Sequence, residues 1–545
     1  MKKEISEIYD LINNRNIDKA YFEAKKLYQV HQRDVRVIKI LAFLNIQRNR
    51  FEQTINLLND FYNRNPEKKD FDYFVNMGVS YQHLEEFEKS LEMYERAREL
   101  NPDSPLGYTV PAEIYLKLRN FKKSNELINI ALAKVMSSNE KTLHFPNVVK
   151  IKTEINVALN KDQENIDFLL NLLKVDFNPD LFYLLASIQP ELINKELLVK
   201  AEAYLKGNDR VFKNSLDRFW YVHPLYFGLA MFYQHVDKKK SENFYHLGNN
   251  ETIKAQRYNS FEYQKNIELI IQNYKSEFLD YETIDDNKKI GENNFFILGT
   301  PRSGTTLIES IIASNKNVKS GGELQSASRL LHEYLAKNEL PNKNEFTHSF
   351  QKTYLKRTNY IKESSKYIID KLPENFLFIG HLLKLLPASK IIRTFRNPWD
   401  VAISLYKQRY VTNIPYSSSF FNIGVFMANF EAINIYWDEC ISKKINIFDI
   451  YYEDLVKKPQ INQKNIYEFL DLEIADFDEE NRRKFFSKTA SIRQIGGQIH
   501  DKSVEKQEFL EFKDEFYDSL LMQRRYWSKK GLNPKNSTFF GYELK

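Results

Sequence analysis

A loop rich in glycine and hydroxyl side chains, Gly299 to Thr306, follows the short apolar run 295–298. The apolar run is typical of a buried parallel strand, and the next segment is expected to be a helix. The unpaired N–H groups and the positive dipole end of that helix would face the loop, which favours binding of a phosphate group. The residues predicted to hold this anion are Arg302, Ser303, Gly304, Thr305 and Thr306.

The two glycines of the loop, Gly299 and Gly304, have the spacing of a nucleotide-binding P-loop, but Thr305 stands where a lysine should follow. A kinase or ATPase of that class needs the lysine on the terminal phosphates and a Mg²⁺ ion nearby. Here a cation, Arg302, precedes the second glycine instead. The loop is therefore predicted to bind an anion other than a nucleoside triphosphate.

A second segment, 390–404, again runs from a predicted strand through a tight turn into a predicted helix. Arg396 ends the strand, and Pro398 occupies the turn or the first helical turn. Ser404 lies two helical turns further on, on the face that returns toward the arginine. An arginine and a hydroxyl that converge there predict a second, separate phosphate site.

The two segments together resemble those of the sulfotransferases that use 3′-phosphoadenosine 5′-phosphosulfate as sulfuryl donor. The similar motifs are Pro-Arg-Ser-Gly-Thr-Thr at 301–306 and Arg-x-Pro-x-Asp-x-x-x-Ser at 396–404, in the family's order and 94 residues apart (396 minus 302). The resemblance implies that the first motif holds the 5′-phosphosulfate. It also implies that Arg396 and Ser404 hold the 3′-phosphate.

Two charged residues at predicted strand ends are candidates for catalysis. Glu323 follows the strand 317–320 on a Gly-Gly turn, so its carboxylate could take a proton from an acceptor hydroxyl; alternatively it stabilises a helix N-terminus. Lys371 could neutralise charge on the bridging oxygen as the sulfuryl group leaves, or pair with Asp370 at the surface. The resemblance to tyrosylprotein sulfotransferases and to bacterial repeat-fused relatives implies that Glu323 is the general base. It also favours a catalytic role for Lys371, together with Arg302.

Three further donor-site residues are implied by the resemblance. Tyr452, in a Tyr-Glu-Asp-Leu segment, would lie near the 3′-phosphate or adenosine, or else be a packed strand aromatic. Ser491 belongs to a Thr-Ala-Ser-x-x-Gln segment that matches the family. Lys506 lies where the family has Gly-Arg-Trp-Arg, but this chain has Glu505 beside it and no Trp-Arg, and Glu505 would oppose an anion.

The N-terminal half repeats with the period of a tetratricopeptide helix-turn-helix. A unit that starts at Phe71 is followed in phase by a second unit and preceded by an earlier one, and a degenerate first unit and a further unit at 223–245 are expected. Its signature residues are Phe74, Met77, Gly78, Tyr81, Ser90, Tyr94, Ala97 and Pro102. We therefore expect helices packed through small residues, with a concave face exposed.

The predicted architecture is an N-terminal all-α tetratricopeptide solenoid followed by an α/β, P-loop-like sulfotransferase domain with a central parallel sheet. The predicted divisions are 1–252 for the helical repeats, 253–290 for a linker helix and polar linker, and 291–545 for the sulfotransferase domain. The strands expected are 295–298, 317–320, 366–369, 390–395 and 445–451. Helices are expected at 149–174, 180–188, 195–205, 253–279, 305–315, 323–337, 374–386, 400–411, 421–442 and 460–470.

Composition narrows the protein class. The chain has 545 residues, of which 42% are hydrophobic and 28% are charged. Its net charge is only +6, and lysines and glutamates are interleaved along the sequence. This charge distribution does not favour nucleic-acid binding. The single cysteine, Cys440, excludes a disulfide within the chain, and the apolar stretches are too short to span a bilayer. The ten histidines are scattered without metal-ligand spacing. We predict a cytoplasmic protein without a metal cofactor.

The function expected is transfer of a sulfuryl group from 3′-phosphoadenosine 5′-phosphosulfate to an acceptor hydroxyl. An acceptor protein or peptide, with tyrosine as the target, or a saccharide would dock on the repeat domain; the sequence leaves these acceptors open. Two alternatives remain at this stage, a repeat scaffold with an inactive C-terminal domain and, less favoured, a P-loop kinase.

Overall fold

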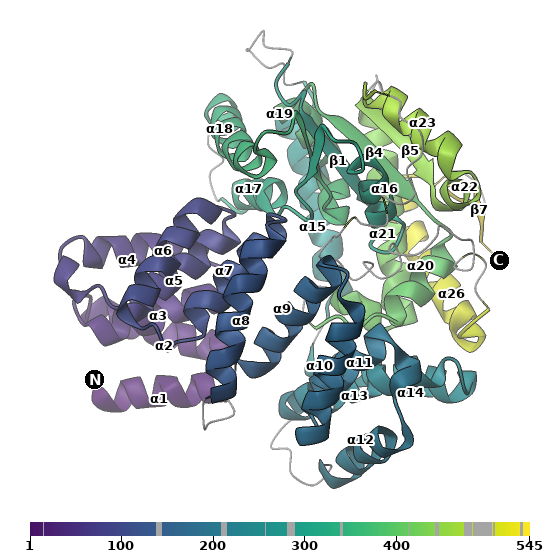
Figure 1. Cartoon of the computed structure of the whole chain (residues 1–545). Coiled ribbons are helices and arrows are strands. Elements are labelled where there is room, and N and C mark those ends of the chain that lie inside the picture. Colours follow the sequence, from purple (N-terminus) through teal and green to yellow (C-terminus); the bar gives the residue numbers. More distant parts are fainter. Residues whose placement is uncertain are drawn as a thin grey trace. The chain divides into compact units, whose positions relative to one another are not determined.

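The computed structural model forms two compact units, residues 1–159 and 160–545. Figure 1 shows the helices and strands in chain order. The residues described are 1–14, 16–137, 144–208, 215–256, 258–280, 289–337, 342–411, 414–441, 446–473, 482, 485, 504, 507–534 and 538–544.

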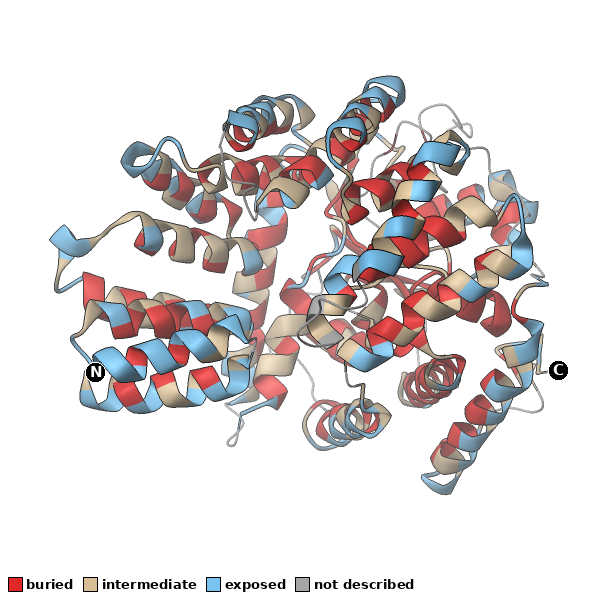
Figure 2. Ribbon diagram, turned by 90° about the horizontal axis from the view of Figure 1, so that it is seen from below, coloured by how far each residue is buried: buried red, intermediate tan, exposed pale blue. Residues whose placement is uncertain are grey.

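The first unit consists of antiparallel helix pairs, and each helix has a buried face and an exposed face (Figure 2). Its helices are α1 Lys2–Asn13, α2 Ile17–Val30, α3 Val35–Gln47, α4 Phe51–Tyr62, α5 Phe71–His83, α6 Phe87–Leu100, α7 Leu106–Lys117, α8 Phe121–Ser137 and α9 Phe145–Ala158, with a 3₁₀ turn at Pro66–Lys68.

Small residues set the distance between the paired helices. A Cβ atom on Gly78 would meet the ring of Tyr94 at 2.7 Å, so α5 and α6 pack through glycine. The Ser90 hydroxyl donates to the Gly78 carbonyl at 2.7 Å, and Ser124 donates to the Ala112 carbonyl at 2.6 Å in the next pair. The same contact at the same repeat position confirms the tetratricopeptide prediction.

The second unit begins with further helices, which precede the sheet in the chain. They are α10 Asp162–Val175, α11 Pro179–Ile188, α12 Lys195–Asn208, α13 Ser215–Tyr233, α14 Lys238–Ala255 and α15 Ser260–Asn273, followed by a π-helical turn at Tyr274–Phe278; a 3₁₀ turn lies at Pro190–Leu192. Ser241 of α14 donates to the Ala230 carbonyl of α13 at 2.7 Å, which repeats the contact of the first unit.

Two of the expected helices are divided in the structure. The segment 149–174 breaks between Ala158 and Asp162, and the segment 253–279 breaks between Ala255 and Ser260. The second break arises because Asn259 caps a new helix, with its side chain accepting from the Phe261 amide at 3.0 Å. The helix α15 then packs into the core of the second unit.

The five predicted strands form one parallel sheet in the order β2-β3-β1-β4-β5. The strands are β1 Asn294–Gly299, β2 Val318–Ser320, β3 Tyr367–Asp370, β4 Lys390–Phe395 and β5 Ile447–Tyr451. The first strand is central, and the chain leaves it toward opposite sides of the sheet. Ligands of such sheets bind beyond the carboxyl ends of the strands near this reversal.

Helices and short turns connect the strands. They are α16 Thr305–Ile312, α17 Ser326–Leu335, α18 Lys343–Lys362, η4 Pro373–Phe378, α19 Ile379–Leu385, α20 Pro398–Tyr406, η5 Pro415–Ser418, α21 Phe420–Cys440, α22 Tyr452–Lys457, α23 Pro459–Phe469, η7 Leu510–Phe512 and α26 Lys513–Lys529, with a C-terminal hairpin of β6 Thr538–Phe539 and β7 Tyr542–Glu543. The sequence did not predict α18, α26 or the hairpin. The helix expected at 374–386 begins as the 3₁₀ turn η4, which starts at Pro373.

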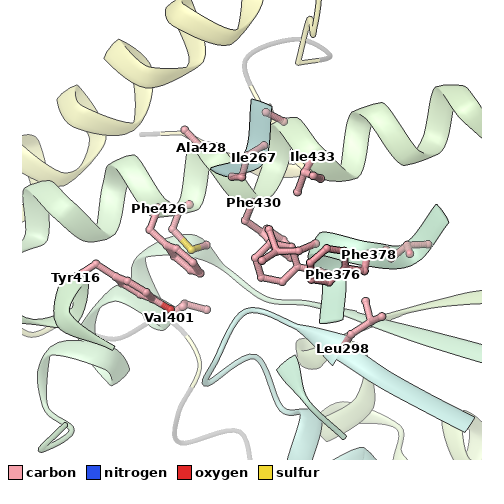
Figure 3. Close-up of a cluster of buried hydrophobic side chains, with 14 of the residues drawn as sticks. Ile267, Leu298, Phe376, Phe378, Val401, Tyr416, Phe426, Ala428, Phe430 and Ile433 are labelled. Atoms are coloured by element: carbon pink, nitrogen blue, oxygen red, sulfur yellow. The ribbon is translucent and has the colours of Figure 1, made fainter. Parts of the chain in front are cut away.

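Alternate residues of β1 enter different cores, as the two-residue period of a strand requires. Phe296 and Leu298 belong to the larger cluster, while Phe295 and Ile297 belong to a second cluster. Figure 3 shows the larger cluster, in which Phe426 and other side chains of α21 meet residues of the sheet and of η4. Within the described residues, none of the helices is both long and apolar enough to cross a bilayer.

Candidate functional site

The carboxyl ends of four neighbouring strands carry the predicted site residues. Gly299 at the end of β1 pairs with Thr394 of β4, and Ser320 at the end of β2 pairs with Ile369 of β3. Because the strands are parallel, the loops that follow them emerge at one edge of the sheet. The sheet therefore brings the two phosphate motifs and the two catalytic candidates to the same edge.

The anion loop has a constrained backbone. Arg302 has φ of 72° and Gly304 has φ of 98°, both in the left-handed region, which costs a non-glycine residue such as Arg302 about 1–2 kcal/mol. Ser303 fastens the loop by donating to the Thr300 carbonyl at 2.7 Å and by a short contact with the Thr394 hydroxyl. No side chain caps the start of α16 at Gly304. The first turn of α16, with Thr305 and Thr306, thus presents backbone N–H groups where an anion would bind.

The two phosphate motifs are in direct contact. The Arg302 Nε donates to the Ser404 hydroxyl at 2.9 Å, and the Arg396 Nη1 donates to the Arg302 carbonyl at 2.9 Å. All three residues are buried. Burial lowers the pKa of Arg302, and the nearby charge of Arg396 lowers the pKa further. Two neighbouring buried guanidinium groups form a setting that favours a multiply charged anion.

Tyr452 covers the glycine loop and the second arginine. Its ring lies 4.2 Å from the guanidinium carbon of Arg396, at cation–π distance. A Cβ atom on Gly304 would lie 2.5 Å from this ring, so glycine permits the close approach. The structure thus places Tyr452 between the two phosphate motifs.

Lys371 lies between two carboxylates. Its Nζ is 2.6 Å from the Glu323 Oε1 and 3.8 Å from the Glu309 Oε2. The side chains of Lys371 and Glu309 are 1% and 0% exposed, whereas that of Glu323 is 41% exposed. Ser320 donates to the Glu309 Oε1 at 2.5 Å and fixes that carboxylate. The Glu323 carboxylate is therefore accessible from solvent, while the buried Glu309 carboxylate holds Lys371 on the other side.

Sequence reasoning missed three residues of this edge. Glu309 lies within an apolar helical run, and a lone carboxylate in such a run is a signal for a buried ion pair. Glu374 follows Lys371 closely in the chain, and burial together with the charge of Glu323 raises its pKa to about 7. Tyr410 interacts electrostatically with Arg302 and Glu323, and burial raises its pKa to about 12.

The segment 407–411 that carries Tyr410 is anchored to the helices that precede the sheet. Arg409 donates to Asp180 of α11 at 3.1 Å and to the His223 Nδ1 of α13 at 3.2 Å. Burial, followed by the charge of Arg409, holds the pKa of His223 well below its usual range, so this imidazole accepts as a neutral group. The helices α11 and α13 thereby position the segment beside Arg302.

Two predicted donor residues, Ser491 and Lys506, lie outside the described residues. Among the residues that the structure does describe, no group of three or more His, Cys, Asp or Glu side chains has a metal-binding arrangement.

Comparison with protein families identifies the domain that carries this site. A model described as "Sulfotransferase family" matches residues 294–476, which span β1 to β5. This domain belongs to the sulfotransferase family. A second model, described as "Psidin, N-terminal TPR repeats region", matches residues 2–169. The chain is therefore a tetratricopeptide-repeat protein with a sulfotransferase-family domain.

Two curated relatives share part of this chain. A protein of Aquifex aeolicus (strain VF5), described as "Uncharacterized protein", is 32% identical over 228 residues, which are 39% of this chain and 30% of the relative. A protein of Caenorhabditis briggsae, described as "Putative protein-tyrosine sulfotransferase", is 25% identical over 200 residues, which are 33% of this chain and 66% of the relative. The match thus spans less than two thirds of either relative.

Solved structures resemble each part of the chain. A tetratricopeptide repeat protein from Parabacteroides merdae is 13% identical and is matched over 96% of its length and 48% of this chain, with a TM-score of 0.32. The sulfotransferase domain of the Synechococcus PCC 7002 olefin synthase is 19% identical and is matched over 98% of its length and 45% of this chain, with a TM-score of 0.28.

Proposed function

We propose that the sulfotransferase domain moves a sulfuryl group from 3′-phosphoadenosine 5′-phosphosulfate to an acceptor hydroxyl. The observation that carries this proposal is the contact between the two phosphate motifs, in which Arg302 bonds Ser404 and Arg396 bonds the Arg302 carbonyl. This arrangement suits a donor with two separate phosphate groups. In the proposed site the anion loop, with Ser303, Gly304, Thr305 and Thr306, binds the 5′-phosphosulfate.

The second motif is proposed to bind the 3′-phosphate, through Arg396 and Ser404 with Tyr452 beside them. Ser491 and Lys506 stay predicted ligands of the same phosphate. The donor's 3′-phosphate distinguishes it from ATP, and Thr305 in place of a P-loop lysine argues against a kinase.

The proposed transfer is an in-line displacement at sulfur. Glu323 takes the proton of the acceptor hydroxyl, the acceptor oxygen forms a bond to sulfur, and the bond from sulfur to the bridging phosphate oxygen breaks. The products are the sulfated acceptor and 3′-phosphoadenosine 5′-phosphate. Lys371 and Arg302 offset the negative charge that develops on the bridging oxygen.

The geometry of the lysine supports these roles. Lys371 bonds one oxygen of Glu323, so the exposed carboxylate keeps a second oxygen for the acceptor proton. On the buried side, Ser320 donates to Glu309, and the Glu309 carboxylate lies next to the Lys371 ammonium group. We further propose that the repeat helices dock the acceptor, a protein or peptide tyrosine or a saccharide, and we retain the cytoplasmic location as a prediction.

A transfer assay tests the proposal. The full chain is incubated with the donor and a panel of phenols, tyrosine peptides and oligosaccharides, and 3′-phosphoadenosine 5′-phosphate release is measured together with the mass of the sulfated product. The Glu323→Gln variant should lose turnover and still bind the bisphosphate, whereas Glu345→Gln, which removes an exposed carboxylate, should keep both. Full turnover by Glu323→Gln would exclude this residue as the base.

A repeat scaffold with an inactive domain is the second candidate. The observation that favours it is the chain's departure from the family at 503–508, where Glu505 stands beside Lys506. Such a scaffold would not bind 3′-phosphoadenosine 5′-phosphate, whereas the proposed enzyme binds it without metal.

A further inference from the structure

A cluster of tyrosines lies beside the glutamates of the proposed transfer site. Tyr416 of η5 is central, with its ring 6.1 Å from the ring of Tyr258 and 6.5 Å from that of Tyr263. Tyr416 is 2% exposed and stacks on Phe426 with 3.9 Å between the ring centroids. Figure 3 shows these two side chains next to each other. The other two tyrosines come from the start of α15 and from the segment before it.

The hydroxyls of these three tyrosines are buried and have no hydrogen-bond partner among the described residues. A buried hydroxyl without a partner costs about 1–3 kcal/mol, so a native site that keeps three of them together calls for a bound partner. The neighbouring rings supply apolar surface, and each adds a buried hydroxyl group. Such a combination is typical of a small-molecule or side-chain binding site.

Glu374 belongs to the same group. Glu374 lies on η4, which contacts α15, and after burial its charge is the next cause that raises the pKa of Tyr258, Tyr263 and Tyr416. Burial first, and then the charge of Glu323, raises the pKa of Glu374 to about 7. No described lysine or arginine forms an ion pair with it, and the nearby Lys371 already contacts Glu309 and Glu323. We call these four residues, Glu374 with the three tyrosines, the tyrosine–glutamate cluster.

The chemistry of this cluster matches a cation. Aromatic ring faces attract an ammonium or guanidinium group by about 2 kcal/mol or more where water is excluded. A cation next to Glu374 would also relieve the repulsion between its carboxylate and that of Glu323. An anionic group would meet two carboxylates and would be rejected.

We propose, on the basis of the sulfuryl transfer proposed above, that the tyrosine–glutamate cluster is an acceptor subsite that binds an ammonium or guanidinium group. The cation is held by Glu374 and the ring faces, and the acceptor hydroxyl then lies beside Glu323. The cluster thereby selects acceptors that carry a positive charge near the hydroxyl that receives the sulfuryl group.

Three phenols of similar size and different charge test the subsite: tyramine, 4-ethylphenol and 4-hydroxyphenylacetate. Each is titrated by calorimetry at pH 8 into the full chain loaded with 3′-phosphoadenosine 5′-phosphate. Tyramine should bind at least about tenfold more tightly than 4-ethylphenol, given a cation–π contribution of about 2 kcal/mol. The anionic phenol should bind most weakly.

The Glu374→Gln variant should prefer tyramine over 4-ethylphenol less strongly than the wild type does, because only the ring faces still attract the cation. Glu262→Gln, which removes an exposed carboxylate of the same helix as Tyr263, should keep the full preference. Tyramine affinity of the wild type should also fall from pH 8 to pH 6 as Glu374 is protonated, and this fall should be smaller in Glu374→Gln. The remaining titratable groups at the site, Glu323 and Tyr416 among them, are common to both proteins.

Equal affinity for tyramine and 4-ethylphenol in the wild type, or an undiminished preference in a folded Glu374→Gln protein, would overturn the subsite. A chain that does not bind the bisphosphate would instead contradict the donor assignment. In that case the same three phenols are titrated into the free chain, and the preference for tyramine still decides the subsite.

Discussion

Replacing Gly304 with alanine should weaken donor binding by disturbing Tyr452. The added Cβ atom would lie 2.5 Å from the ring, far inside contact distance, so the ring must move away from Arg396. The 4.2 Å cation–π contact would then be lost. Such contacts contribute about 0.5–2 kcal/mol, which corresponds to about 2- to 30-fold weaker binding of 3′-phosphoadenosine 5′-phosphate.

A second glycine separates this effect from backbone strain. Gly531 has φ of 89°, close to the 98° of Gly304, and an added Cβ atom there would meet nothing within 4 Å. Both alanine variants should lose about 1 kcal/mol of unfolding free energy, since the left-handed penalty of about 1–2 kcal/mol is offset in part by the lower entropy of the unfolded chain. Only Gly304→Ala should bind the bisphosphate more weakly.

The assay is calorimetric titration of 3′-phosphoadenosine 5′-phosphate, with stability measured by urea unfolding of the same samples. Wild-type affinity in a folded Gly304→Ala protein would show that the contact between Tyr452 and Arg396 does not contribute to donor binding. An equal loss of affinity in Gly531→Ala would refute this contribution as well, since that change would then act through the backbone alone.

Three further substitutions have expected outcomes. Glu309→Gln removes the buried one of the two carboxylates that hold Lys371, an interaction of about 1–2 kcal/mol. The kcat should therefore fall about 5- to 30-fold while the donor KM changes little; an unchanged kcat would contradict the positioning role. Glu431→Ala breaks the buried ion pair with Arg524, in which the arginine is 7% and the glutamate 4% exposed. The free energy of unfolding, measured in urea, should fall by about 3–5 kcal/mol. Glu468→Ala, which breaks an exposed pair, should lower it by less than about 1 kcal/mol. Glu374 has a folded-state pKa raised from 4.5 to about 7, so its contribution to stability falls as pH rises through that window, and Glu374→Gln should gain melting temperature relative to the wild type between pH 5 and pH 8. A constant difference between the two proteins would contradict that pKa.

The sheet could be predicted from the sequence because β1, β3 and β4 contain short apolar runs that end at, or next to, glycine or a charged residue. All five expected strands are present, from 295–298 to 445–451. The repeats could also be predicted, since Gly78 and Ser90 occupy fixed positions of the repeat at which close helix packing requires small residues. Local signals and packing agree in these elements.

The helices near the core were harder to predict. The apolar period runs on past Ala255, and the interruption before Ser260 depends on a single Asn cap. The helix α26 has many charged residues, and its partners on α21 are distant in sequence; the Trp527 Nε1, for example, donates to the Asn429 Oδ1 at 2.7 Å. Contacts between residues so distant in sequence produce no local hydrophobic periodicity from which the helix could be predicted.

The candidate site divides in the same way. The motif residues at strand ends, such as Arg302, Arg396 and Lys371, could be predicted because strand ends converge at one edge of the sheet. Glu374 and the tyrosines could not, since they come from separate segments and become neighbours only in the folded chain. The direct bond between Arg302 and Ser404 was not predicted either, because it depends on the α20 helix bringing its serine back to the first loop.

The most direct test of the donor site is calorimetric titration of 3′-phosphoadenosine 5′-phosphate into the full chain without metal. Adenosine 5′-phosphate and ATP with Mg²⁺ serve as comparison ligands, and Arg396→Ala is compared with Arg525→Ala, which removes an exposed arginine. We expect tight binding of the bisphosphate but not of the two comparison ligands. Affinity should fall about 10- to 150-fold in Arg396→Ala, as expected for a charged contact of about 1.5–3 kcal/mol. Absence of bisphosphate binding, or equal binding by the Arg396→Ala protein, would contradict the proposed donor site.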